Sequence, residues 1–506
     1  MSEQFSYFLQ AGSDLFGGWT FLIVSLAVLL GLVVGAIPGL TGTLALALLI
    51  NLTYGMETNT AVSFLLGVYV GAVSGGLFSA IMLNIPGTPN AAATALDGFP
   101  LAKAGKGGKA LFGGVFASFL GTLLSTTIMM LLTPVIYLVA LKFGKWELFL
   151  LAFFGITICG NLSVDSTPLK GWIVGFLGFF FAMIGRDAIY NSPRFVVLKD
   201  LNSGITLVPA LIGLFGIAEV LCVLMDRTPY KIQDTMGSII PDKSEMKSLL
   251  RPVVRSGLIG CGIGAIPGAG EDIAAWLSYS VGRSRSKEKD KFMHGSFEGL
   301  SCSETANNAC IAGAMIPMLT LAIPGSSQAA MFLAAMNLHG VKPGPMLSIQ
   351  DPTFMYLVGI VLIIAAFTMV ILALMLTKPM VMILKINRKI LMPIIVPLTM
   401  IGAYATNGKV FDVWVALFFG IIGFILRKCN FSMAPLVLGL ILGGSADTNF
   451  RQAMTQGNFG ALIIRPAGIV LLIVCIYSLV SGAIKTVKSA KSAMAANTEI
   501  TKESAE

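Results

Sequence analysis

The chain has 506 residues, of which 56% are apolar and only 12% are charged, and its mean hydropathy is +0.85. Soluble domains carry about 25% charged residues, so this composition excludes an ordinary soluble protein and indicates a membrane protein. The net charge of +9 requires no nucleic acid partner, because cytoplasmic loops of membrane proteins are enriched in Lys and Arg.

A helix that spans a bilayer needs about 20 apolar residues. Uncharged stretches long enough to span include 16–34, 61–86, 110–141, 353–377, 390–408 and 466–484. Shorter candidates are 148–162, 171–185, 201–218, 413–426 and 431–446. The sequence therefore predicts an all-α polytopic membrane protein with roughly 11–14 membrane segments, some of them too short to be full spans.

The N-terminus carries Glu3 and Asp14 and no Lys or Arg before the first span. It lacks the basic start of a cleaved signal peptide, so we expect the first span to stay in the mature protein. The Cys residues have no paired spacing of a metal site or disulfide framework, and two His make a zinc site or a His-based triad unexpected. No phosphate-binding GxxxxGK[ST] motif occurs. We expect no cofactor, no resident metal, no catalytic residue and no enzyme activity.

Two motifs occur twice in the chain. Gly-Ala-Ile-Pro-Gly at 35–39 returns unchanged at 264–268, and Asn-Ile-Pro-Gly-Thr-Pro-Asn at 84–90 has the counterpart Ala-Ile-Pro-Gly-Ser-Ser-Gln at 322–328. The first pair is offset by 229 positions and the second by 238, and a third pair, Pro209 and Pro435, is offset by 226. The pattern predicts two copies of one unit.

The repeats and the polar segments around them set the predicted organisation. We expect a first membrane repeat at 1–226, a polar linker at 227–251, a second membrane repeat at 252–446 and an extra C-terminal span within 447–484. The tail at 485–506 is Lys, Ala, Ser and Glu without a core pattern, and is predicted to be disordered. Within the first repeat, the Gly- and Lys-rich stretch 97–109 is predicted to be a loop.

Charge in matching loops bears on how the repeats are inserted. The segment 283–291 is strongly basic where its counterpart 54–60 has no base, and 103–109 has three Lys where 341–350 has one. Matching loops would share a charge sign if they shared a side, so the repeats are predicted to be inverted. The basic residues in both 142–145 and 378–389 argue the other way. An odd number of crossings per repeat plus the extra span would place the N-terminus in the periplasm and the C-terminus in the cytoplasm.

A Pro-Gly pair inside an apolar segment removes a backbone donor and allows a non-helical turn, which hydrocarbon tolerates only where the freed groups face protein or a watery cavity. Helices that restart after Gly39, Gly87, Gly268 and Gly325 would point N–H groups at one place near the midplane, which suits an anionic substrate. The predicted substrate-binding set adds the residues at these restarts: Thr41, Thr43, Thr88, Asn90, Gly270, Ser326, Ser327 and Gln328. For each hydroxyl, plain helix capping is the alternative.

Five acidic and amide side chains lie in or beside the apolar segments. Glu304, Asn307 and Asn308 are spaced by three and four, which places them on one helical face. Such residues are expensive inside a membrane, so we predict that they bind a coupling cation, with a helix–helix contact as the alternative. Glu271 and Asp272 follow the second Gly-Ala-Ile-Pro-Gly motif, directly after Ala269 and Gly270. They are predicted to bind the coupling ion, carry a proton or pair with a base of the other repeat.

Two further expectations concern residues near span ends. Arg186 and Asp187 are predicted to form an ion pair. Trp276, four residues after Asp272, is expected to pack or to anchor the helix at an interface.

These motifs together resemble the large membrane subunit of tripartite tricarboxylate transporters, the TctA family. The resemblance covers about 15–480, and the segments that carry it are 35–39, 83–89, 94–100, 264–270, 304–309, 323–326 and 339–345. It implies a bacterial inner-membrane permease that works with a small four-span membrane subunit and a periplasmic solute-binding protein. It also implies uptake of carboxylates such as citrate, driven by a Na⁺ or H⁺ gradient and not by ATP.

The chain departs from the pattern of that family in two places. After Gly39 it has Leu-Thr-Gly-Thr where Leu-Gly-Pro-Thr is expected, and after Gly268 it has Ala-Gly-Glu-Asp where Ala-Gly-Ala-Thr is expected. Two acids beside an anion site repel a tricarboxylate unless they are protonated or bind a cation. Two alternatives follow: a permease that works alone on a less anionic solute, and a membrane-embedded enzyme that modifies lipids. The second would need clustered acids or His at a water interface.

Overall fold

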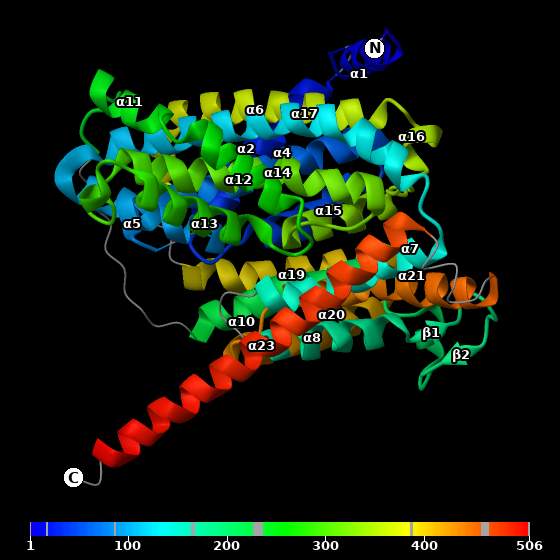
Figure 1. Cartoon of the computed structure of the whole chain (residues 1–506). Coiled ribbons are helices and arrows are strands. Elements are labelled where there is room, and N and C mark those ends of the chain that lie inside the picture. The colour runs from blue at the N-terminus through cyan, green and yellow to red at the C-terminus, as the bar shows by residue number, and fades with distance from the viewer. Residues whose placement is uncertain are drawn as a thin grey trace. The chain divides into compact units, whose positions relative to one another are not determined.

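The computed structural model describes residues 2–16, 19–85, 88–162, 167–225, 236–384, 388–456 and 465–503. These residues are almost entirely helical, and the strands among them form one two-stranded antiparallel sheet of β1 (Gly185–Arg186) and β2 (Pro193–Arg194). Figure 1 shows the long helices and the small sheet. The predicted all-α fold class is confirmed.

The chain divides into two compact units, which are described separately. Unit 1 comprises 1–141 and 206–424, and unit 2 comprises 142–205 and 425–506. Each predicted repeat contributes segments to both units, so the units are not the repeats. The repeat boundaries therefore stay predictions.

The first repeat supplies a series of helices to unit 1, and the series is interrupted at its two Pro-Gly motifs. In order they are α1 (Ser2–Phe16), α2 (Thr20–Ala36), α3 (Gly42–Leu49), η1 (Ile50–Thr53), α4 (Thr58–Leu83), η2 (Pro89–Ala91), α5 (Ala92–Leu101), η3 (Ala102–Lys106), α6 (Gly107–Ala140), α9 (Leu207–Leu211), η5 (Ile212–Ile217) and α10 (Ala218–Met225).

The second repeat supplies a matching series, with breaks at the matching motifs. After α11 (Lys243–Leu250), which lies in the predicted linker, its elements are α12 (Val253–Gly264), α13 (Gly270–Arg285), η6 (Lys289–Lys291), α14 (Phe297–Leu321), α15 (Ser327–Leu338), α16 (Leu347–Gln350), α17 (Phe354–Met375), α18 (Thr377–Ile383), α19 (Arg388–Asn407) and α20 (Val410–Lys428), whose last residues fall in unit 2.

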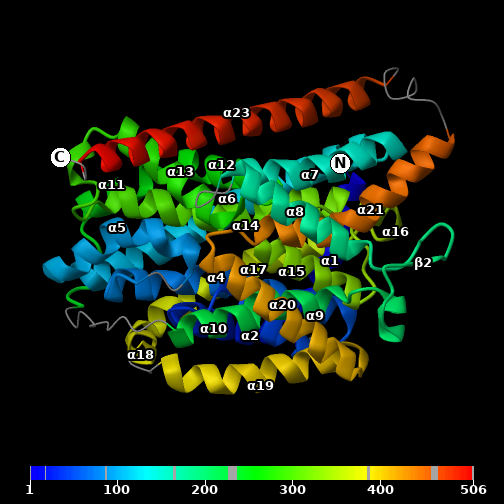
Figure 2. The ribbon, with the colours of Figure 1, turned by 90° about the horizontal axis from the view of Figure 1, so that it is seen from below.

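Unit 2 is smaller. It contains α7 (Lys145–Leu162), α8 (Pro168–Ala182), the two strands, η4 (Lys199–Ser203), α21 (Ala434–Gln456) and α23 (Pro466–Glu503). Figure 2 gives a second view of the same ribbon, in which α23 is the long red helix.

Helix directions in unit 1 follow from glycine contacts. Gly67 of α4 lies against Val24, and Gly75 lies against Leu32 and Ala36, so α2 and α4 run parallel. In the second repeat, Gly260 of α12 lies against Ala306 of α14 and Gly264 lies against Cys310, so α12 and α14 also run parallel. Helices can approach this closely only where one of them lacks a Cβ.

The two parallel pairs run in opposite directions. Gly114, near the start of α6, lies close to Ile81, near the end of α4, so these helices are antiparallel. Ser118 of α6 contacts Glu304 of α14, and Tyr137 contacts Leu319, so α6 and α14 are parallel. It follows that α4 and α14 are antiparallel. This is the arrangement that inverted repeats require.

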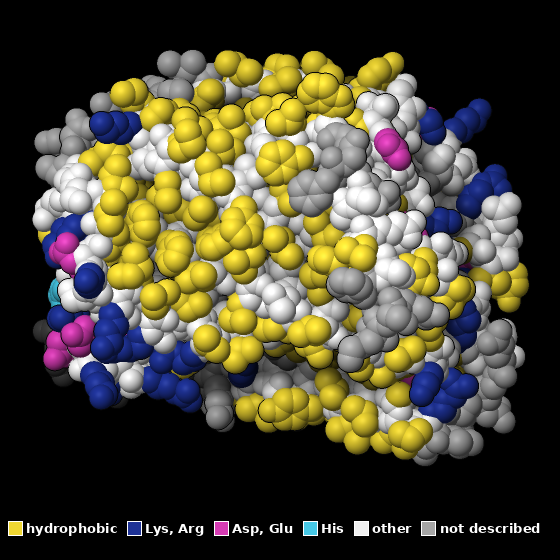
Figure 3. Space-filling model, turned by 90° about the horizontal axis from the view of Figure 1, so that it is seen from above, with side chains coloured by type: hydrophobic (Ala, Val, Ile, Leu, Met, Phe, Trp, Pro, Cys, Tyr) yellow, Lys and Arg dark blue, Asp and Glu magenta, His cyan; other side chains and the backbone are white. Residues whose placement is uncertain are grey.

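The two ends of unit 1 differ in charge. One end holds the last turn of α13, the turn into α6 and α11, and includes Lys103, Lys106, Lys109 and the basic segment 283–291; we call it the basic end. The opposite end contains 50–57 and 339–353, whose ionisable Asp, Glu and Lys residues are Glu57, Lys342 and Asp351 alone. On the face in Figure 3, hydrophobic side chains cover the middle, whereas Lys and Arg gather toward the edges.

Within the residues that the structure describes, six helical segments are long and apolar enough to cross a membrane: 58–83, 89–140, 207–225, 354–375, 410–428 and 466–487. Four shorter apolar helices lie at 20–36, 42–53, 168–182 and 391–407. Outward-facing side chains such as Leu131 on α6 (70% exposed) and Met375 on α17 (75%) are hydrophobic, which is disfavoured in water. The chain is therefore a multi-pass membrane protein. The count of 11–14 segments stays a prediction.

The structure corrects the predicted loop at 97–109. Residues up to 101 belong to α5, and the chain continues through η3 directly into α6. Ala and Leu favour helix here. Gly105 takes up the kink with a φ of 78°, a conformation that only glycine adopts readily.

The predicted C-terminal boundaries also differ from the structure. The boundary at 446/447 lies inside α21, because Arg451 pairs with Asp447 one turn earlier (3.3 Å) and supports the polar half of that helix. The tail predicted to be disordered is helical over 485–503, where α23 continues. Ala, Lys and Glu are strong helix formers, and extending an existing helix needs no new nucleus.

The predicted linker 227–251 contains the helix α11. Asp242 and Glu245 form a capping box at its start, and Glu245 also accepts from Lys106 (2.9 Å) and Lys109 (3.0 Å). Burial alone would raise the pKa of Glu245, but the Asp242 N–H and the two lysines outweigh that effect and lower the pKa to about 2. This ion-pair cluster fixes α11 to the basic end of unit 1.

Candidate functional site

Four breaks in the helices coincide with the four Pro-Gly motifs. They separate α2 from α3, α4 from η2, α12 from α13, and α14 from α15, and are called breaks 1 to 4 in that order. Asn84 and Ala322, the first residues after α4 and α14, share the left-handed conformation with φ of 56° and 59°. Gly39 and Gly268 also match, with φ of 88° and 68°. The predicted broken helices are confirmed at all four motifs, although Pro86 and Gly87 of break 2 lie outside the described residues.

Two of the predicted hydroxyls cap the helices that follow them. Thr41 accepts from the N–H of Leu44 (3.2 Å), and Ser326 accepts from that of Ala329 (3.1 Å). For these two side chains the capping alternative accounts for one hydrogen bond. Thr43 is buried in the first turn of α3, and Ser327 is half-buried at the start of α15.

Breaks 1, 3 and 4 meet in the middle of unit 1. The N–H of Gly270 donates to the carbonyl of Gly325 (3.1 Å), which joins breaks 3 and 4. The amide of Gln328 lies against Gly42, where a Cβ would stand 3.3 Å from Nε2, which joins breaks 1 and 4. Tyr69 of α4 donates to the carboxylate of Glu271 and shares a hydrogen bond with Ser326 (2.8 Å).

Break 2 joins this group through α14 and α13. Asn90 donates from Nδ2 to Oδ1 of Asn307 (2.8 Å), and η2 packs against α13. The four breaks therefore surround one polar centre, with the helix starts of α3, α5, α13 and α15 around it.

The predicted cation-binding face of α14 is fully buried and contacts three helices. Glu304 accepts from Thr94 at Oε1 (2.5 Å) and from Ser118 at Oε2 (2.8 Å). Asn308 accepts from Ser74 (2.7 Å). Glu304, Asn307 and Asn308 have no solvent exposure. Their side chains lie between α4, α5 and α6, as the predicted single face requires.

Three polar atoms in this centre have no hydrogen-bond partner in the part of the chain that the structure describes. They are Thr88 Oγ1, Asn90 Oδ1 and Asn307 Nδ2. Their side chains are 1%, 3% and 0% exposed. A buried polar atom without a partner costs about 1–3 kcal/mol. A hydroxyl, which can donate or accept, an amide oxygen and an amide N–H group thus point to a site that a polar ligand or a cation completes.

The two predicted acids after break 3 differ in environment. Glu271 is buried and bonded to Tyr69, whereas Asp272 is half-buried on the first turn of α13. The positive φ of Gly270, 78°, sets the direction in which α13 starts.

The sequence analysis missed four side chains of the centre: Tyr69, Ser74, Thr94 and Ser118. They lie in apolar segments and carry no formal charge, so neither hydropathy nor charge singled them out. For Tyr69, the offset between the two repeats could have indicated a role. The offset of 238 that relates Pro86 to Pro324 also relates Tyr69 to Asn307. Each of these two contacts the break of the opposite repeat.

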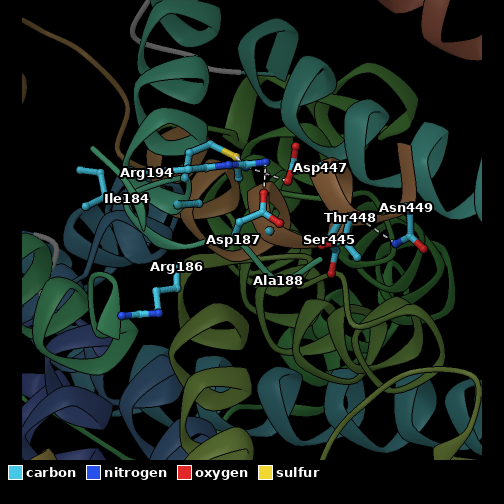
Figure 4. A pocket seen from close by; sticks show the side chains of 12 residues that line it. Ile184, Arg186, Asp187, Ala188, Arg194, Ser445, Asp447, Thr448 and Asn449 are labelled. Atoms are coloured by element: carbon cyan, nitrogen blue, oxygen red, sulfur yellow. Dashed lines mark hydrogen bonds and ion pairs between the residues drawn. The ribbon is translucent and has the colours of Figure 1, made fainter. Parts of the chain in front are cut away.

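A second polar cluster lies in unit 2, around a cavity of about 390 Å³ between the two strands and the polar half of α21. Figure 4 shows Asp187 and Asp447 beside Arg194. Asp187 is bonded to Arg194 and Arg451, and not to the neighbouring Arg186, which donates to the carbonyl of Asn191 (3.4 Å). The predicted Arg186–Asp187 pair is therefore wrong, because the turn between the strands directs the two side chains apart.

The same contacts perturb Asp187. The hydrogen bond from Arg451 is the largest effect, and with the N–H groups of Tyr190 and Ile189 it holds the pKa of Asp187 well below its usual range. Arg194 also contacts Asp447 (3.0 Å). Two arginines are thus balanced by two aspartates, which indicates a structural clamp between the strands and α21.

Comparison with known proteins decides the family. The profile of the tripartite tricarboxylate transporter TctA family matches residues 21–438, a range that contains all four breaks. The chain belongs to the TctA family. As a TctA protein it is a membrane component of a transporter, and every residue of the polar centre named above lies inside the matched range.

Two relatives come from Agrobacterium vitis. An uncharacterized 52.8 kDa protein in the TAR-I ttuC′ 3′ region is 32% identical over 475 residues, which is 93% of this chain and 94% of the relative. An uncharacterized protein in the TAR-II ttuC′ 3′ region is 35% identical over 219 residues, 42% of this chain and 90% of the relative. No solved structure matches the chain.

Proposed function

We propose that the chain is the permease subunit of a binding-protein-dependent secondary transporter, which takes up tri- or dicarboxylates by alternating access with Na⁺ or H⁺ as the coupling cation. The observation that carries the proposal is the convergence of four helix breaks on buried polar atoms without partners. Broken helices that meet at a central site are a feature of secondary transporters with inverted repeats.

The substrate part of the site consists of the helix starts at the breaks. Backbone N–H groups at the starts of α3, α5, α13 and α15 carry the positive ends of the helix dipoles, which favour a carboxylate. Thr88, Asn90 and Asn307 supply the free hydroxyl, carbonyl and amide groups. A di- or tricarboxylate with hydroxyl or protonated oxygens can use both the donor and the acceptors.

The cation part of the site consists of the buried carboxylates. Glu304 and Glu271 are surrounded by hydroxyl groups and are not paired with Lys or Arg in the described ion pairs. A buried carboxylate without a cationic partner is costly unless it is protonated or binds a cation. A proton or Na⁺ at these groups offsets the repulsion between Glu271, Asp272 and an incoming anion, so cation and substrate would bind together.

The tripartite family assigns partner subunits in general. We propose a small four-span membrane subunit and a periplasmic solute-binding protein, with the chain in the bacterial inner membrane. The basic end of unit 1 would face the cytoplasm. Since α2 starts at the opposite end, the N-terminus would be periplasmic. An odd number of crossings per repeat plus the extra span would then place the C-terminus in the cytoplasm.

The test is uptake into proteoliposomes that contain the chain and its small subunit, with candidate binding proteins outside. Labelled citrate, other carboxylates and a neutral control are offered under separately imposed Na⁺ and proton gradients. Uptake that needs both a binding protein and one gradient supports the proposal and identifies the cation. Equal uptake without either would contradict it and favour a permease that works alone.

Two glutamates of α14 provide a matched pair of variants. Glu304→Gln removes the charge at the polar centre and should abolish dependence on the cation gradient. Glu298→Gln removes an equally buried charge at the start of the same helix, where Ser286 donates to it (2.8 Å), and should leave the gradient dependence unchanged. Loss of coupling in both variants would indicate a structural defect of α14 and not a cation site.

A further inference from the structure

A cavity in unit 1 lies beside the C-terminal half of α13. Its volume is about 600 Å³. Its lining includes Leu96 of α5, Trp276, Ser280 and Arg283 of α13, and Lys289 of the following turn. Figure 1 shows α5 and α13 at the same end of the unit, which is the basic end. None of these residues contributes to the hydrogen bonds of the polar centre.

One face of α13 connects this cavity to the polar centre. Asp272, Trp276, Ser280 and Arg283 are spaced by four, four and three residues, so they form one stripe along the helix. The stripe starts in the first turn after break 3 and ends in the last turn, a length of about 16 Å at about 1.5 Å per residue. Trp276, Ser280 and Arg283 are exposed, whereas Ser278 on the other side of the helix is fully buried.

The charge of the cavity is positive. Arg283 and Lys289 line it together with a single acid, Asp290. Neither base forms an ion pair within the described part of the chain, and Arg283 donates to the sulfur of Met293 (3.5 Å). By contrast, two nearby lysines do form ion pairs: Lys291 with Glu288 (3.0 Å) and Lys109 with Asp242 (2.8 Å).

We infer that this cavity is a carboxylate-binding station at the inner mouth of the transport path, where Arg283 and Lys289 hold the anion after it has passed along the exposed face of α13 and before it is released. The inference rests on the proposed function for its substrate. A guanidinium can bind a carboxylate with two parallel hydrogen bonds, and Lys289 adds a point charge beside it. Trp276 and Ser280 then line the passage between this station and break 3, which gives Trp276 a place on the path and not only a packing role.

The inference is tested without transport, by the reaction of an introduced thiol. Ser280→Cys is treated with an anionic and a cationic methanethiosulfonate reagent of similar size, and modification is measured by mass spectrometry of the peptide that contains residue 280. We expect the anionic reagent to react about three- to tenfold faster, as two nearby positive charges predict. Adding Arg283→Gln should remove most of this preference, and adding Arg283→Lys should restore it.

Leu277→Cys is the matched control. Leu277 is on the same turn of α13 and is 42% exposed, but it does not line the cavity. Because it lies outside the cavity that Arg283 and Lys289 line, it should show no preference for the anionic reagent. In sealed vesicles of known orientation, Ser280→Cys should react from the cytoplasmic side.

Citrate is the probe for binding. It should slow the modification of Ser280→Cys, and less so when Arg283→Gln is added. No charge preference at residue 280, reaction from the periplasmic side alone, or no protection by citrate or by any carboxylate that the transporter takes up would overturn the inference. If the charge preference at residue 280 is as expected but the proteoliposomes show no gradient-driven uptake of carboxylates, the result would instead count against the proposed function.

Discussion

Asp97 forms a hydrogen-bonded link between the repeats that a double-mutant cycle can measure. From α5 in the first repeat, Oδ1 accepts from the N–H groups of Gly295 (3.0 Å) and Ser296 (2.8 Å), just before α14. Oδ2 accepts from the hydroxyl of Tyr279 on α13 (2.8 Å), which itself accepts from the N–H of Met293 (3.1 Å). Asp97 is fully buried, and donors surround both of its oxygens, as an ionised carboxylate requires.

The expected loss in the free energy of unfolding depends on which hydrogen bond each substitution removes. Asp97→Asn keeps an oxygen for the two backbone N–H groups but places an amide NH₂ against the Tyr279 hydroxyl. A hydrogen bond to a charged acceptor contributes about 1.5–3 kcal/mol, so we expect Asp97→Asn to lower the free energy of unfolding by about that amount. Tyr279→Phe removes the same bond and should cost a similar amount. The double variant loses the bond only once, so its cost should fall short of the sum by about 1.5–3 kcal/mol.

The assay is equilibrium unfolding of the purified chain in mixed micelles of detergent and dodecyl sulfate, followed by far-ultraviolet circular dichroism. Tyr356→Phe on α17 is the control, because that hydroxyl makes no hydrogen bond within the described part of the chain and does not contact Asp97. Its effect should add to that of Asp97→Asn. Additive costs for Asp97→Asn and Tyr279→Phe, to within about 0.5 kcal/mol, would refute the link.

Three further predictions concern helix packing and α11. Gly121→Ala should destabilise the chain by about 1–3 kcal/mol in the same assay, because the new Cβ would collide with the carbonyl of Thr305 on α14; a neutral result would show that α6 and α14 can separate freely. Gly262→Ala, on the exposed side of α12 with no atom within 4 Å of the new Cβ, should instead be neutral or stabilise by about 0.5–1 kcal/mol. Because the folded pKa of Glu245 is lowered to about 2, its ion pairs stabilise α11 above the ordinary pKa of about 4.3 and are lost as the pH falls toward about 2. Amide hydrogen exchange in α11, corrected for intrinsic rates, should therefore accelerate between about pH 5 and pH 2.5, and Glu245→Gln should remove most of that pH dependence; an unchanged dependence would show that another group controls the helix.

Several features could be predicted because their causes are local in the sequence. Proline lacks a backbone donor wherever it occurs, so the four Pro-Gly motifs indicated the four breaks. Composition alone indicated membrane helices, and the uneven distribution of bases indicated inverted repeats, as the directions of α4 and α14 require. The spacing of Glu304, Asn307 and Asn308 indicated a single buried face.

Local signals also misled where helix formation depends on context. The stretch 97–109 looked like a loop because Gly and Lys are common in loops, yet one residue, Gly105, takes up the kink and the helices continue on both sides. The neighbours Arg186 and Asp187 looked like a pair, but the turn between β1 and β2 separates them and brings in Arg451 from more than 250 positions away.

The sequence by itself determined that this chain is an all-α membrane protein, where its helices break and which family it resembles, since hydropathy, proline and motif spacing act over short distances along the chain. Only the tertiary structure decided what surrounds the site. Tyr69 meets Glu271, and Thr94 meets Glu304, across 202 and 210 positions of sequence. Hydroxyls in apolar helices carry no signal of their own, and packing between the two repeats alone selects which of them face a buried carboxylate.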